Sequence, residues 1–87
     1  MIQPTIGRKV WFWPVEGHGH MNCIDEQQPF DATVVFVHND RLVNLIVVDH
    51  MGHVERVNKA TLKQEEDPVP AGSYAEWMPY QVKQSQK

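Results

Sequence analysis

Residues 30–62 read FDATVVFVHNDRLVNLIVVDHMGHVERVNKATL, and this stretch decides the fold. Its valines, isoleucine and aromatic residues favour extended backbone, so we expect three consecutive strands here. The strands should span residues 30–38, 42–49 and 53–62. The connections between them, Asn39-Asp40 and His50-Met51-Gly52, are rich in turn residues, and Gly52 suits a positive φ. Connections this short join antiparallel neighbours, so the stretch predicts an antiparallel sheet.

Alternate residues of the middle strand give two apolar faces. We assign the face of Val43, Leu45 and Val47 to the core, because it is apolar without interruption. The opposite face carries Leu42, Asn44, Ile46 and Val48. A small barrel has one interior, so this second face must be covered by another part of the chain or by a partner.

Two clusters of aromatic residues and proline flank this central stretch. Trp11-Phe12-Trp13-Pro14 lies near the start of the chain, and Glu76-Trp77-Met78-Pro79-Tyr80 lies near its end. Large rings at both ends of a short chain indicate that the ends meet and close one core. The first cluster belongs to a strand over 6–14, followed by a long loop over 15–29 that contains two glycines.

The acidic segment 63–72 contains two prolines and reads as a connection. Ser73 and Glu76 have capping-box spacing, which predicts one helical turn over 73–77, before a short last strand over 78–82. The expected fold is therefore an all-β, five-stranded antiparallel barrel formed by residues 1–82, with 83–87 as a polar tail. Its long first loop and its helical turn before the last strand resemble the layout of an SH3-like barrel.

A second resemblance concerns the terminal motifs. The segments IQPTIGRKVWFWP and YAEWMPYQ, the central DRLVNL and the acidic proline-containing stretch Glu65–Pro70 resemble a group of small proteins encoded by tailed phages and prophages of proteobacteria. The likeness extends over most of the chain. It implies a phage origin, but the group has no established activity, and no site residue can be transferred from it.

Composition limits the function classes. The formal net charge is −3, so the positive field of a general nucleic-acid-binding protein is absent and nucleic acid is not an expected partner. A single cysteine excludes an internal disulfide and favours a reducing compartment, which we expect to be the cytoplasm of a bacterial host. No apolar run is long enough to span a bilayer, so we expect no membrane partner.

The loop 15–29 holds the best candidate for a metal site. His18, His20 and Cys23 are suitable zinc or copper ligands, although their spacing matches no standard zinc site. The simpler interpretation is a polar loop with surface imidazoles and an incidental cysteine. We favour the simpler interpretation and expect no cofactor.

Two catalytic arrangements were weighed and not favoured. Cys23 and Asp25 supply residue types of a thiol enzyme, but a reactive thiol needs a nearby oriented base. Asp49, His50 and His53 supply acid–base groups, but they flank a hairpin turn in which polar residues are expected anyway. We therefore expect a protein without catalytic activity.

Partner binding remains the best-supported class. Trp11, Trp13, Trp77 and Tyr80 can form a binding surface, although we favour the interpretation that the Trp77 segment covers the first strand and closes the core. The apolar outer face of the middle strand adds Leu42, Ile46 and Val48. We expect a small phage-encoded accessory protein that binds a protein partner or a second copy of itself. The alternative is a protein that binds a small ligand or a metal through the loop His18–Cys23, and a nucleic-acid accessory module comes third.

Overall fold

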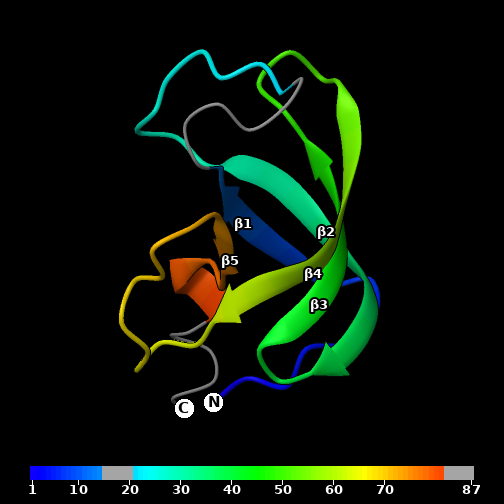
Figure 1. The fold of residues 1–87 in the computed structure, drawn as a ribbon, viewed down its shortest axis with the longest axis vertical. Coiled ribbons are helices and arrows are strands. Elements are labelled where there is room, and N and C mark those ends of the chain that lie inside the picture. Colours follow the sequence, from blue (N-terminus) through cyan, green and yellow to red (C-terminus); the bar gives the residue numbers. More distant parts are fainter. Residues whose placement is uncertain (15–20, 82–87) are drawn as a thin grey trace.

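The computed structural model describes residues 1–14 and 21–81 and shows five strands that close into a small β-barrel (Figure 1). The strands are β1 (Lys9–Trp13), β2 (Phe30–Asn39), β3 (Leu42–Val48), β4 (Val54–Lys63) and β5 (Tyr74–Glu76). The predicted barrel of the SH3-like type is confirmed. The predicted tail over 83–87 lies outside the described residues.

The strand order around the barrel follows the chain, and β1 pairs with β5 to complete the circle. Four of the five neighbouring pairs are antiparallel, and the short connections require this for β2 with β3 and for β3 with β4. The exception is β4 with β5, which is a short parallel pair of Leu62 with Ala75 and Lys63 with Glu76. The segment 64–73 carries the chain from the end of β4 back to the start of β5, so both strands run in the same direction.

The C-terminal elements differ from the expected bounds. Residues 74–76 form the last strand, and the helical residues 79–81 follow it. The capping-box pattern at Ser73 and Glu76 was therefore misleading, because pairing with β1 and β4 draws residues 74–76 into the sheet. Pro79 then stands at the first helical position, where the missing N–H costs no hydrogen bond.

Irregular positions curve the long strands. The register of β2 against β3 shifts between Val34 and Phe36, and that of β3 against β4 shifts between Val43 and Leu45. At the second shift Lys59 has a φ of 55°, and its N–H donates to Asn44 Oδ1 at 2.7 Å. Such bulges bend and twist strands, which helps a five-stranded sheet to close.

The barrel interior is filled by alternate residues of all five strands and by Trp77. The predicted inward face of β3 is confirmed, because Val43, Leu45 and Val47 are fully buried. The complete core consists of Val10, Phe12, Phe30, Ala32, Val34, Val43, Leu45, Val47, Ala60, Leu62, Ala75 and Trp77. Both terminal motifs contribute a large ring to this core, so the two ends of the chain meet as expected.

Candidate interaction surfaces

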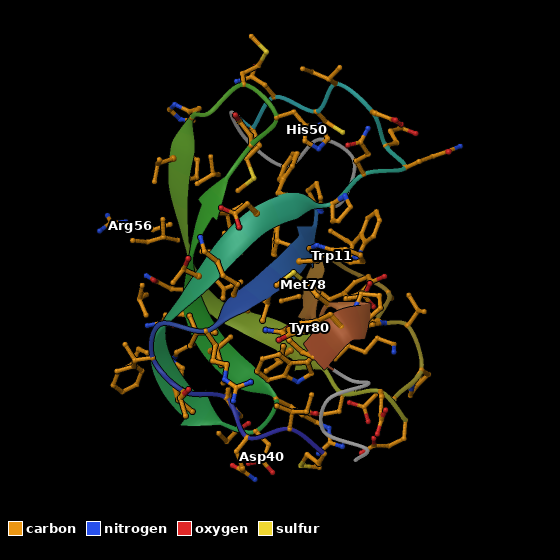
Figure 2. All side chains as sticks on the ribbon, turned by 180° about the vertical axis from the view of Figure 1, so that it is seen from behind. Trp11, Asp40, His50, Arg56, Met78 and Tyr80 are labelled. Atoms are coloured by element: carbon orange, nitrogen blue, oxygen red, sulfur yellow. The ribbon has the colours of Figure 1, made fainter. Side chains whose placement is uncertain are left out.

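The outer side of β1 and β5 carries a cluster of aromatic side chains. Phe12 and Ala75 face each other across the two strands and are fully buried. Their neighbours along each strand therefore point outward, and the partners Trp13 and Tyr74 lie on the same outer surface. The chain then continues over this side of the barrel, where Figure 2 shows Trp11, Met78 and Tyr80. We name this surface the aromatic face and define it as Trp11, Trp13, Tyr74, Met78 and Tyr80.

Hydrogen bonds hold the aromatic face in one geometry. Trp13 Nε1 donates to Glu76 Oε1 at 2.8 Å, which fixes the indole across the β1–β5 pair. Gln81 Nε2 donates to the carbonyl oxygen of Lys9 at 2.9 Å, and Gln81 Oε1 accepts from the backbone N–H of Met78 at 2.9 Å. These bonds attach the helical residues 79–81 to the barrel.

Exposure varies across the aromatic face. Tyr80 is 69% exposed, whereas the other four side chains are half-buried. Partial burial, together with the negative charge of Glu76, raises the pKa of the Tyr74 phenol above its ordinary value. The face thus offers large rings that are positioned by the fold and still accessible.

A second apolar surface lies on the outer side of β2, β3 and β4. Val35, Phe36, Ile46 and Val54 are exposed to 39%, 49%, 40% and 57%, and Val48 is half-buried among them. The register places Ile46 opposite Thr33 on one side and Arg56 on the other. We name this surface the aliphatic face and define it as Val35, Phe36, Ile46, Val48 and Val54.

The turn between β3 and β4 anchors the described part of the first loop through Asp49. Asp49 Oδ2 accepts from the backbone N–H and the side-chain amide of Asn22 at 2.8 and 3.0 Å. Asp49 Oδ1 accepts from the backbone N–H groups of Met51 and His53, each at 2.9 Å. Burial alone would raise the pKa of Asp49, but these donors outweigh burial and lower the pKa to about 2.

His50 anchors the same loop through both ring nitrogens. Nδ1 accepts from the backbone N–H of Ile24 at 2.9 Å, and Nε2 lies 3.1 Å from the carbonyl oxygen of Gln28. These partners require neutral imidazole with its proton on Nε2. The ring also makes an edge contact with Phe30, at 4.8 Å between centroids. Polar bonds thus secure the segment together with Met21, which is partly buried and packs against the core.

Among the residues that the structure describes, those considered for metal binding or catalysis do not converge on one point. His18 and His20 lie outside the described residues, and Cys23 is exposed. The turn residues Asp49 and His50 are directed at loop backbone, whereas His53 Nε2 lies 2.8 Å from Glu55. Within residues 1–14 and 21–81, no three side chains of the histidine, cysteine or acidic type are grouped as metal ligands would be.

The residues predicted to bind a partner are divided between the surfaces and the core. Trp11, Trp13 and Tyr80 belong to the aromatic face, and Ile46 and Val48 belong to the aliphatic face. Leu42 is half-buried at the start of β3, outside the aliphatic face as defined here.

Trp77 is also among the residues predicted to bind a partner, and the structure corrects that prediction. It is 4% exposed and belongs to the core, and its Nε1 donates to Gln64 Oε1 at 3.2 Å. The guanidinium carbon of Arg8 lies 5.7 Å from the centre of its ring. This tryptophan covers the barrel interior, so it is not a docking residue.

Five members of the surfaces were not identified from the sequence, namely Tyr74, Met78, Val35, Phe36 and Val54. Two of them show why. Tyr74 was assigned to a helical turn, and its place on the aromatic face follows from its pairing with Trp13. Phe36 faces outward next to Val35 because the register shift in β2 interrupts strict alternation. No local pattern marks that shift. The capping-box spacing of Ser73 and Glu76 favoured a helical turn, so the strand that contains Tyr74 was not predicted.

No protein-family model, curated protein or solved structure matches this chain. In the part of the chain that the structure describes, no helix has the length and apolar character needed to cross a membrane.

Proposed function

We propose that this is a small, non-catalytic interaction protein of phage origin, which binds another protein of the phage or its host through the aromatic face. One observation carries the proposal: each terminal motif divides its side chains between the core and that face. Phe12 and Trp77 fill the barrel, while Trp11, Trp13 and Tyr80 remain outside. Core formation therefore accounts for only two of these five large rings.

The chemistry of the aromatic face suits a protein partner. Tryptophan, tyrosine and methionine are enriched at the centres of protein interfaces, since they bury much apolar area with few rotatable bonds. The Trp13–Glu76 and Gln81–Lys9 hydrogen bonds keep the rings in place before binding. A preorganised surface loses less conformational entropy on association, which strengthens binding.

The charges beside the aromatic face favour some classes of partner over others. Trp11 lies between two carboxylate residues, Asp31 on β2 and Glu76 on β5. Lys9 offsets part of the charge of Asp31 through an exposed ion pair at 3.2 Å, whereas Glu76 is hydrogen-bonded to the neutral indole of Trp13. The remaining negative charge, with the net charge of −3, favours an apolar segment with a basic neighbour and disfavours a nucleic-acid backbone. The single cysteine fits work in the reducing cytoplasm of a bacterial host.

Affinity capture from lysates of phage-infected host cells tests the proposal. The bait is the intact chain, compared with Tyr80→Ala on the aromatic face and with Val69→Ala as a control. Tyr80 and Val69 are similarly exposed, at 69% and 68%, so neither change should disturb the fold. Proteins retained by the chain and by Val69→Ala but lost with Tyr80→Ala are candidate partners.

Calorimetry with the purified candidate then measures the effect. Tyr80→Ala should weaken binding at least about tenfold, the magnitude of a contributing interface residue. The proposal fails if every retained protein binds Tyr80→Ala and Trp11→Ala as well as it binds the unchanged chain.

A further inference from the structure

The aliphatic face is a continuous surface that spans three neighbouring strands. Val48 is directly opposite Val54 on β4, and Ile46 occupies the next outward position on β3. Phe36 on β2 is opposite Asn44, one outward step further along β3. These positions are adjacent on the sheet, so their exposed side chains form one patch and are not scattered surface residues.

The aromatic segment at the C-terminal end does not cover this patch. Residues 74–76 pair with β1 and β4, and Gln81 is bonded to Lys9 on β1. The described part of the first loop is attached at Asn22 and Ile24 to the β3–β4 turn. Ile46 therefore remains 40% exposed in the middle of the sheet.

The charges beside the patch favour a second copy of the chain as its occupant. Arg56 flanks Ile46 on the β4 side, is exposed, and makes no ion pair with another described residue (Figure 2). Asp31 flanks Val48 on the β2 side; its Oδ2 lies 3.2 Å from Lys9 Nζ in an exposed ion pair, and its Oδ1 accepts no hydrogen bond from Lys9. Consider a two-fold axis that lies between two stacked copies and runs nearly along β3. Such an axis places Ile46 against its own copy. It also places Arg56 above β2 of the other copy, next to the Asp31 of that copy.

We propose that the aliphatic face is the interface of a homodimer, in which two barrels stack β2–β3–β4 face to face with β3 near the axis. The two-fold symmetry produces the contact between Arg56 and Asp31 twice, so the charges are complementary only in this orientation. Stacked sheets with nearly aligned strands are a common packing arrangement. The apolar residues of this interface are distinct from those of the aromatic face, and the inference does not depend on the proposed function. Asp31 borders both surfaces, because it lies between Trp11 on β1 and Val48 on β3.

The size of the patch sets the expected affinity. Three strands about 4.8 Å apart, over six residues that each rise about 3.4 Å, give a footprint of roughly 300 Å² on each copy. This is smaller than the roughly 800 Å² per partner of a standard stable interface. We therefore expect a weak, reversible dimer with a dissociation constant of about 10–100 µM.

Sedimentation velocity of the intact chain between about 1 and 500 µM tests the dimer. The mean mass should rise with concentration from one chain towards two. Ile46→Asp should raise the dissociation constant at least tenfold, because it buries a carboxylate at the axis. Val69→Asp changes an exposed apolar side chain in the segment between β4 and β5, and it should leave the association unchanged.

A charge exchange keeps the test valid if Ile46→Asp fails to fold. Arg56→Glu should weaken the dimer several-fold, and Arg56→Glu combined with Asp31→Lys should restore it. The inference is overturned by a monomer throughout the concentration range, or by a dimer that neither Ile46→Asp nor Arg56→Glu weakens. A dimer that is lost with Tyr80→Ala and kept with Arg56→Glu also overturns it, because the copies would then meet through the aromatic face.

Discussion

At the scale of single residues, Gln64 connects parts of the chain that are distant in sequence. Its side chain is 1% exposed and lies directly after β4. Oε1 accepts from the backbone N–H of Ile2 at 3.1 Å and from Trp77 Nε1 at 3.2 Å. Nε2 donates to the carbonyl oxygens of Ile2 and Asp40 at 3.0 and 2.9 Å. One amide group therefore joins the N-terminal segment, the β2–β3 turn and the core tryptophan.

Gln64→Leu should lower the free energy of unfolding by about 2–4 kcal/mol. Leucine has a similar volume but leaves the partners of the amide without hydrogen bonds, and each unpaired buried polar group costs about 1–3 kcal/mol. Urea denaturation measures the change. Gln28→Leu is the control, because Gln28 is exposed and its replacement should cost less than about 0.5 kcal/mol. Equal losses in the two variants would contradict this role for Gln64.

At the scale of elements, the β3–β4 turn joins its two strands and also holds the first loop in place. Gly52 has a φ of 85°, which confirms the positive φ expected from its place in the turn. The preceding residues Asp49 and His50 hold the loop from Asn22 to Gln28 by hydrogen bonds to its backbone. The sequence of the loop 15–29 shows no apolar periodicity that would indicate how it is held. In its described part, hydrogen bonds to another element and the packing of Met21 against the core hold it in place.

Asp49 makes the stability of the protein depend on pH in acid. Its pKa is about 2 in the folded chain and near 3.8 when unfolded, so folding favours the ionised form. The contribution of Asp49 is fully present above pH 3.8 and is lost as the pH falls towards 2. The stability difference between the unchanged chain and Asp49→Asn should therefore shrink over that interval, as measured by urea denaturation at several pH values. A constant difference from pH 6 to pH 2 would contradict the assignment.

At the scale of the whole molecule, the barrel is closed by a short element. β5 has three residues, and it joins β4 to β1 through two short ladders. Trp77 follows β5 directly and fills the interior beside it. The closure therefore depends on a large ring as well as on backbone hydrogen bonds, in keeping with the small core of a chain of this length.

Trp77→Ala should cost about 3–5 kcal/mol, the range for truncating a buried large aromatic side chain. Domains of this kind are stable by only about 5–15 kcal/mol, so the variant should lose much of its stability. Thermal and urea unfolding measure the loss. Tyr80→Ala is the matched control, since its ring is 69% exposed and its removal leaves no cavity. A melting temperature within a few degrees of that of the unchanged chain would show that Trp77 does not close the core.

The identity of β1, β2, β3 and β4 as strands was predictable, because it follows from local chemistry. Valine-rich runs separated by short turns specify hairpins, and the unbroken apolar alternation of Val43, Leu45 and Val47 specifies the inward face of β3. The meeting of the two aromatic motifs was also predictable, because a chain of 87 residues can build only one core around so many rings.

Tertiary structure alone decided that Phe12 is the buried ring of the first motif and where the C-terminal elements lie. Residues 74–76 satisfy their backbone by pairing with β1 and β4, and this gain exceeds the local preference of Ser73 and Glu76 for a helix cap. The parallel pairing of β4 with β5, the bulge that exposes Phe36 and the contacts of Gln64 join residues remote in sequence. No local sequence pattern predicts such contacts, because the two partners of each contact come together only when the barrel closes.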